Sequence, residues 1–316
     1  MTLEKPFYKI QAKLMGNHFE LTAVHENELL AQKAVEAGVA EIKRIEALLS
    51  TFQESSETNA INRFAGIKPV TVSEETFSLI ERAQRISQVT DGAFDLSYGS
   101  LDKRFWNFDT SMQSLPNKQT ASKSVALINY KNIVLNPVSS TVMLKQEGMR
   151  IGFGGIGKGY AADKAKQIML KMGVHSGVVN ASGDLSVWGN QPNGEPWTIG
   201  IANPNLSNTI FSYFKISNIA MATSGNYEKY AIINGKKYSH TINPRTGYPV
   251  EGIKSVTILT SFAELADAMA TPVMILGVEA GLSLINQIDQ MEVIIIDDND
   301  QVFTSKNIHL KTEIDA

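Results

Sequence analysis

The stretch from Met221 to Gly277 decides most of what this sequence predicts. It reads MATSGNYEKY at 221–230, SHTINPRTGYPV at 239–250 and TSFAELADAMATPVMILG at 260–277. The last segment has the apolar period of a helix, which places Asp267 and Thr271 on one face, one turn apart. The neighbours of Asp267 in this helix are nearly all apolar, so its carboxylate is expected in a crowded setting where it needs a partner.

A glycine loop, GGIGKGYAAD at 154–163, lies upstream and leads into a predicted helix. It satisfies GxGxxG from Gly152 to Gly157, but no acidic residue follows about twenty positions later, as dinucleotide binding requires. It also satisfies GxxxxGK, but Gly159 replaces the hydroxyl residue of a phosphate-binding P-loop. What remains is a helix N-terminus that can bind an anion, with Lys158 as an added charge, or else a tight turn with a solvated lysine.

Together, the loop and the Asp267–Thr271 pair predict a site for a hard cation that holds a phosphate group. Mg²⁺ needs only one or two carboxylates, because water and substrate phosphates complete its octahedron. The alternative is a solvated helix face, which is the commoner setting of an isolated D-x-x-x-T.

Three further polar residues are candidates. His240 is expected in a strand before the turn at 243–247, where it is either an acid/base or a structural histidine. Asp95 in DGAFD and Asp184 in NASGD lie in glycine-flanked turns, as turn caps or ligand contacts. Met15 and Phe52 are by default core residues near the ends of elements.

Composition excludes several classes of function. The 316 residues carry a net charge of −3, and no basic stripe interleaved with aromatic residues is present, so nucleic acid is not an expected partner. There is no cysteine, which removes disulfides, thiolate metal sites and cysteine nucleophiles. No stretch has the length of a membrane span, and the N-terminus has no signal-peptide core. We therefore expect a cytoplasmic protein, or an exported one whose signal has been removed.

The order of elements favours an α+β fold with largely antiparallel sheet, in a single domain over 1–316. We expect helices at 28–49, 73–90, 160–172, 262–276 and 279–288, and hairpins at 7–24, 133–145 and 293–304. The first hairpin is expected to turn at Gly16–Asn17, and another at Asn234–Gly235. The polar stretch Lys103–Ser124 is expected to be a mobile loop.

Taken together, the motifs resemble the ApbE family, the FAD:protein FMN transferases. The resemblance covers most of the chain. Its blocks, in chain order, are LMGNHFEL (14–21), LLSTFQESSETNAINRF (48–64), DGAFDLSYGSL (91–101), GGIGKGYAADKA (154–165), VNASGDLSVWG (179–189), PWTIGIANP (196–204), ATSGNY, SHTINPRTGYPV and ADAMAT.

The resemblance implies an α+β fold related to T-fold proteins, with FAD in a central cleft and Mg²⁺ on its pyrophosphate. Family members move FMN from FAD to a Thr or Ser hydroxyl of a target flavoprotein and release AMP. Two alternatives stay open: hydrolysis of FAD to FMN and AMP, and FAD binding without turnover.

The family's site residues map onto this sequence by position. His240 matches the general base. The metal positions are the backbone carbonyl of Gly155 and the residues Asp267, Ala270 and Thr271, with Ala270 at a position that is acidic in some relatives. Positions that match flavin or adenine contacts are Met15, Phe52, Ala93, Phe94, Asp95, Gly152, Lys158 and Ile242. Two of these differ from many relatives: Gly152 stands where an acidic residue is common, and Phe52 where tyrosine is.

Overall fold

The computed structural model describes residues 5–102, 106, 112, 114–202, 210–226 and 230–308. Its largest element is an eight-stranded antiparallel sheet in the order β1-β2-β6-β7-β10-β13-β14-β15. The bounds of these strands are β1 Phe7–Leu14, β2 Asn17–Val24, β6 Gly177–Ala181, β7 Asp184–Trp188, β10 Ala220–Gly225, β13 Ile253–Thr260, β14 Glu292–Asp297 and β15 Val302–Thr304.

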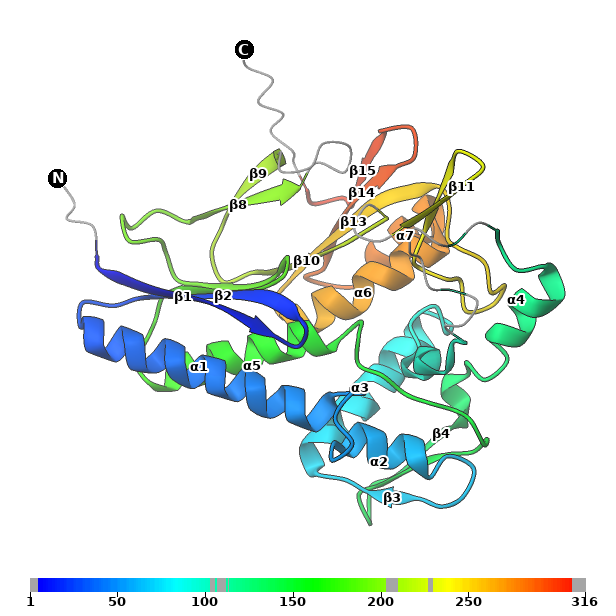
Figure 1. Cartoon of the computed structure of the whole chain (residues 1–316). Coiled ribbons are helices and arrows are strands. Elements are labelled where there is room, and N and C mark those ends of the chain that lie inside the picture. The colour runs from blue at the N-terminus through cyan, green and yellow to red at the C-terminus, as the bar shows by residue number, and fades with distance from the viewer. Residues whose placement is uncertain are drawn as a thin grey trace.

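Helices cover one face of this sheet (Figure 1). The long helix α1 lies beside α5, and α5 lies beside α6, which packs on β10 and β13. The helices are α1 Glu28–Leu49, α2 Glu57–Arg63, α3 Glu74–Val89, α4 Lys118–Ser124, α5 Gly157–Lys171, α6 Ala263–Leu276 and α7 Val278–Ile285, with short 3₁₀ helices η1 Leu96–Ser100 and η2 Tyr130–Asn132.

The central strands of the large sheet, from β6 to β14, are largely buried on both faces, and alternate residues serve different cores. On β6, Val179 belongs to the main core under the helices, while its neighbour Val178 packs on the opposite face. That opposite face is covered by the hairpin of β8 (Trp197–Ala202) and β9 (Ile210–Ile216), through Ile201 and Ile216. This alternation follows from the two-residue period of a strand.

Two smaller sheets complete the fold. One has the order β3-β5-β4, from Val70–Thr71, Thr141–Leu144 and Ile133–Asn136. The other is the hairpin of β11 (Tyr230–Ile233) and β12 (Lys236–Ser239), which packs with α4 in a small separate hydrophobic cluster. The cluster consists of Leu101, Trp106, Met112, Ala121, Val125, Ala231, Ile233 and Ile242.

The expected α+β class is confirmed, and four local expectations need correction. The first hairpin turns at Met15–Gly16, both with positive φ, and Asn17 already belongs to β2. Helix α5 starts three residues earlier than expected, at Gly157, and His240 lies just beyond β12 rather than in a strand.

The fourth correction concerns the stretch Lys103–Ser124, of which the last part forms α4. Asn117 caps this helix through its side chain, and Ala121 packs in the small cluster. Residues 103–105, 107–111 and 113 of the expected loop lie outside the described part of the chain.

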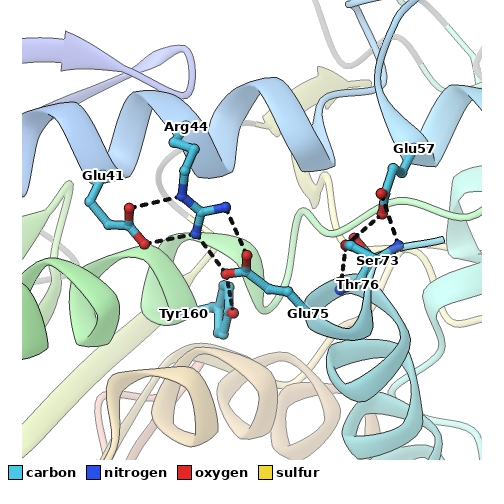
Figure 2. A network of polar contacts seen from close by, with 7 residues as sticks. All are labelled: Glu41, Arg44, Glu57, Ser73, Glu75, Thr76 and Tyr160. Atoms are coloured by element: carbon cyan, nitrogen blue, oxygen red, sulfur yellow. Dashed lines mark hydrogen bonds and ion pairs between the residues drawn. The ribbon is translucent and has the colours of Figure 1, made fainter.

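A polar network holds three helices together close to the start of α5 (Figure 2). Arg44 on α1 binds Glu41 and also Glu75 on α3, with N–O distances of 2.7–2.8 Å. The Tyr160 hydroxyl on α5 donates to Glu75 at 2.6 Å. Burial and the Glu75 carboxylate raise the pKa of Tyr160, so its hydroxyl remains a donor. The network therefore fixes the first turn of α5 against two other helices.

Candidate functional site

The N-terminal ends of α5 and α6 meet, and this junction carries the glycine loop, Lys158 and Asp267. The Asp267 carboxylate accepts the backbone N–H of Gly159 through Oδ2 at 3.0 Å. A Cβ atom at Gly159 would lie 2.0 Å from the Ala263 carbonyl oxygen, so only glycine allows the helices to approach this closely. The helix that bears Asp267 is thereby placed directly against the loop that was predicted to bind phosphate.

Lys158 lies between two buried carboxylates. Its Nζ forms an ion pair with Asp184 Oδ2 on β7 and lies 3.8 Å from Asp267 Oδ1. The side chain of Lys158 is 25% exposed, whereas those of Asp184 and Asp267 are 4% and 7% exposed. Two carboxylates beside one ammonium leave a net negative charge in a poorly solvated place, which favours a further cation.

Burial raises the pKa of Asp267, and the charge of Lys158 and the N–H of Gly159 act in the opposite direction. A cation bound to this carboxylate would therefore relieve a real desolvation cost.

The oxygen donors at the junction suit Mg²⁺. Thr271 follows Asp267 by one turn and is half-buried, while Ala270 is fully buried and has no side-chain donor to offer. In the described part of the chain, no group of three or more His, Asp and Glu residues could form an all-protein metal cage. A site with few protein ligands is the kind in which Mg²⁺ keeps water and binds substrate phosphates.

Two of the residues matched to flavin contacts, Phe94 and Met15, lie against the glycine loop, and a third, Phe52, follows a residue that does. The Phe94 ring lies 3.7 Å from the position of a Cβ on Gly155, and the Met15 methyl lies 3.5 Å from that position on Gly157. Phe52 follows Thr51, whose methyl lies 3.7 Å from the corresponding position on Gly152. Met15 and Phe94 pack in the main core, but Phe52 is 91% exposed and leaves its ring free to stack.

Asp95 organises the segment that carries Ala93 and Phe94. Its carboxylate caps η1 by accepting the Ser97 N–H and hydroxyl, at 2.7 and 2.6 Å, and it accepts the Tyr130 N–H at 2.7 Å. Burial raises the pKa of Asp95, and these hydrogen bonds oppose the shift. Ala93 is buried beside it. The structure thus gives the Asp95 side chain three partners within the protein.

The segment with His240 is attached to the same region by polar contacts that follow the histidine in the chain. His240 is half-buried and directly follows β12. Two residues later, the backbone N–H of Ile242 donates to the Tyr98 hydroxyl of η1 at 3.0 Å. Arg245, in the next turn, donates to the backbone carbonyl of Asp91 and pairs with its carboxylate. Tyr98 is half-buried, and burial of its hydroxyl raises its pKa to about 12. The hydrogen bond to Tyr98 connects the candidate base to the helix that Asp95 caps.

A cavity of about 550 Å³ lies away from these residues and is lined by Lys5, His25, His175 and Gln191 among others. None of the candidate site residues contributes to it.

Comparisons with known proteins give the family. A family model described as the ApbE family matches residues 15–295. This chain belongs to the ApbE family.

Two ApbE relatives cover nearly the whole chain. A protein of Klebsiella pneumoniae (strain 342) named FAD:protein FMN transferase is 31% identical over 306 residues, with 96% of this chain and 93% of that protein covered. One of the same name from Haemophilus influenzae is 24% identical, with 96% and 90% covered.

Solved ApbE structures have the same fold. The ApbE protein of Thermotoga maritima superposes with a TM-score of 0.87 at 30% identity, covering 95% of this chain and 97% of that one. The apo flavinyl transferase ApbE of Pseudomonas stutzeri gives a TM-score of 0.83 at 24% identity, covering 96% of each chain. Because its identity is only 24%, the likeness to the Pseudomonas stutzeri structure supports the fold alone.

Sequence reasoning gave no role to Tyr98 or Asp163, and it left Asp184 open between a turn cap and a ligand contact. Tyr98 lies inside the ApbE-like block 91–101, but its partner is a backbone N–H 144 positions away. The N-terminus of α6 did indicate that a distant residue such as Asp163 was needed. The N-cap residue, Phe262, has no side-chain acceptor for the first N–H groups of the helix, so another residue must accept them.

Proposed function

We propose that this protein transfers FMN from FAD to a Thr or Ser hydroxyl of an acceptor protein, with Mg²⁺, and releases AMP. The observation that carries the proposal is the junction of α5 and α6. It joins the glycine-rich start of α5, a lysine and two buried carboxylates within one small volume. The relatives named FAD:protein FMN transferase support the same activity.

In the proposed reaction, the acceptor oxygen attacks the phosphorus of the FMN half of FAD. The bond from this phosphorus to the bridging oxygen breaks, AMP leaves with that oxygen and its electron pair, and His240 takes the hydroxyl proton. Asp267, Thr271 and the Gly155 carbonyl would hold Mg²⁺, which would offset charge on the pyrophosphate. Lys158 would bind phosphate oxygens. Phosphoryl transfer depends mainly on such positioning and charge.

The test is to incubate the protein with FAD and Mg²⁺, with and without a candidate acceptor, and to follow AMP, free FMN and protein-bound flavin. The proposal expects AMP and bound flavin in equal amounts, only with acceptor and metal, and none with a chelator. AMP with free FMN in the absence of acceptor would instead identify an FAD pyrophosphatase. FAD binding without AMP release would identify a non-catalytic flavin carrier.

A further inference from the structure

Neither α5 nor α6 caps its own N-terminus. The N-cap residues are Ile156 and Phe262, and neither side chain accepts a hydrogen bond from its helix. The first turn of a helix leaves N–H groups that need acceptors, and most helices supply a local Ser, Thr, Asp or Asn. Here each helix obtains its acceptor from the other.

Asp163, in the second turn of α5, caps α6. Its buried carboxylate accepts the Glu264 N–H through Oδ2 at 3.0 Å and also accepts the Ala263 N–H. Its Oδ1 accepts the Ser186 hydroxyl of β7 at 2.9 Å. One carboxylate thus joins the start of α6, the body of α5 and the sheet.

Asp267, in the second turn of α6, caps α5 in return through the Gly159 N–H. On α5, Asp163 lies about one turn after the capped residue Gly159, and on α6, Asp267 lies about one turn after the capped residues. The two contacts are therefore arranged in the same way on both sides of the junction. Without a Cβ on Gly159, the helix backbones touch between the contacts. The position of Asp267 relative to Lys158 is therefore set by both contacts together.

We propose that Asp163 is a positioning residue for this centre: by holding the first turn of α6 against α5, it sets the distance between Lys158 and the Asp267–Thr271 face. The inference rests on the function proposed above, because it assumes that this face receives the metal. The hydrogen-bond partners of Asp163 are Ser186, Ala263 and Glu264, and Lys166 is a charged neighbour. None of these is a candidate contact of FAD or metal. Asp163 therefore acts through α6.

The first experiment uses Asp163→Ala, which removes both side-chain oxygens and with them the cap on α6. Mn²⁺ serves as a paramagnetic probe of the metal site in metal-free protein saturated with FAD. We expect Mn²⁺ affinity to fall about ten- to a hundredfold, as for groups that orient metal ligands. FAD affinity without metal should change less than about threefold.

A second variant separates positioning from simple helix stability. Phe262 is 56% exposed and has extended backbone angles, so Phe262→Ser can provide α6 with a local cap. In the double variant Asp163→Ala/Phe262→Ser, we expect the melting temperature to recover while Mn²⁺ affinity stays low. This variant also supplies folded protein if Asp163→Ala alone is not recovered.

Ser186→Ala is the matched control, because it removes one partner of Asp163 and leaves the cap on α6 intact. Its Mn²⁺ affinity should stay within about threefold of the wild type. Wild-type Mn²⁺ affinity in Asp163→Ala, or recovery of both the melting temperature and Mn²⁺ affinity in the double variant, would overturn the inference. If the wild-type protein itself neither binds Mn²⁺ nor releases AMP, the proposed function is overturned instead.

Discussion

The two sides of the candidate centre are built in different ways. The α5–α6 junction belongs to the main core, where the helices touch at Gly159 and cap one another through Asp163 and Asp267. The His240 segment follows a two-stranded hairpin that packs in a small separate cluster, and one hydrogen bond ties it to η1. The core thus fixes the proposed phosphate and metal side, whereas the proposed proton-accepting side is held by the small cluster, the Tyr98 hydrogen bond and the contacts of Arg245 with Asp91.

This difference predicts that the two sides can be disrupted independently, and His240→Asn should give the largest effect. A positioned base contributes about a hundred- to ten-thousandfold to rate, so AMP release should fall within that range. FAD and Mg²⁺ affinity should be kept, because the junction is untouched. The measurement is AMP release per folded, FAD-saturated molecule. A variant with wild-type rate would show that His240 only packs.

Asp267→Asn tests the other side and should reduce Mg²⁺-dependent AMP release about a hundred- to a thousandfold. Because asparagine can also accept the Gly159 N–H and so cap α5, we expect only a small change in melting temperature. Rates measured across Mg²⁺ concentration and thermal melts give the two numbers. Asp289→Asn, at an exposed aspartate, is the control. Unchanged turnover at saturating Mg²⁺ would remove Asp267 from the metal site.

Tyr98→Phe tests the hydrogen bond between the His240 segment and η1. It keeps the ring but removes the acceptor of the Ile242 N–H, at a cost of about 1–3 kcal/mol. We expect kcat to fall about tenfold with little change in Mg²⁺ affinity, because the segment after His240 loses one of its anchors. Tyr213→Phe, on the exposed side of β9, should behave as wild type. A Tyr98→Phe variant that lost metal affinity and kept kcat would contradict the division into two sides.

Glu75→Gln should give the smallest effect, because it acts on the partly exposed network behind α5. The hydrogen bond from Arg44 lowers the pKa of Glu75, so its carboxylate stabilises the folded state at neutral pH. This contribution, below about 1 kcal/mol, should be lost as pH falls through the lowered pKa. Melting temperatures of wild type and variant should therefore differ most near pH 7 and converge near pH 3. A difference that grew with acidity would contradict this sign.

Local signals predicted the elements of the chain well. Ser73 caps α3 as expected, and Asn234–Gly235 forms the turn of its hairpin with positive φ at both residues. The sequence failed where packing overrode a local pattern. The end of the polar stretch 103–124 becomes α4 because it can bury Ala121 against the β11–β12 hairpin, and His240 leaves its strand where the chain turns toward Tyr98.

The sequence by itself determined the α+β class, most helix and hairpin positions and the membership of the ApbE family. Caps, turns and periodicity act within a few residues, so they can be read along the chain. Only the tertiary structure decided that Asp163 caps α6 and that Asp267 caps α5, through contacts between residues 101 and 108 positions apart. Such contacts exist because the helices lie side by side on the sheet and Gly159 lets their backbones touch, and no local pattern encodes that arrangement.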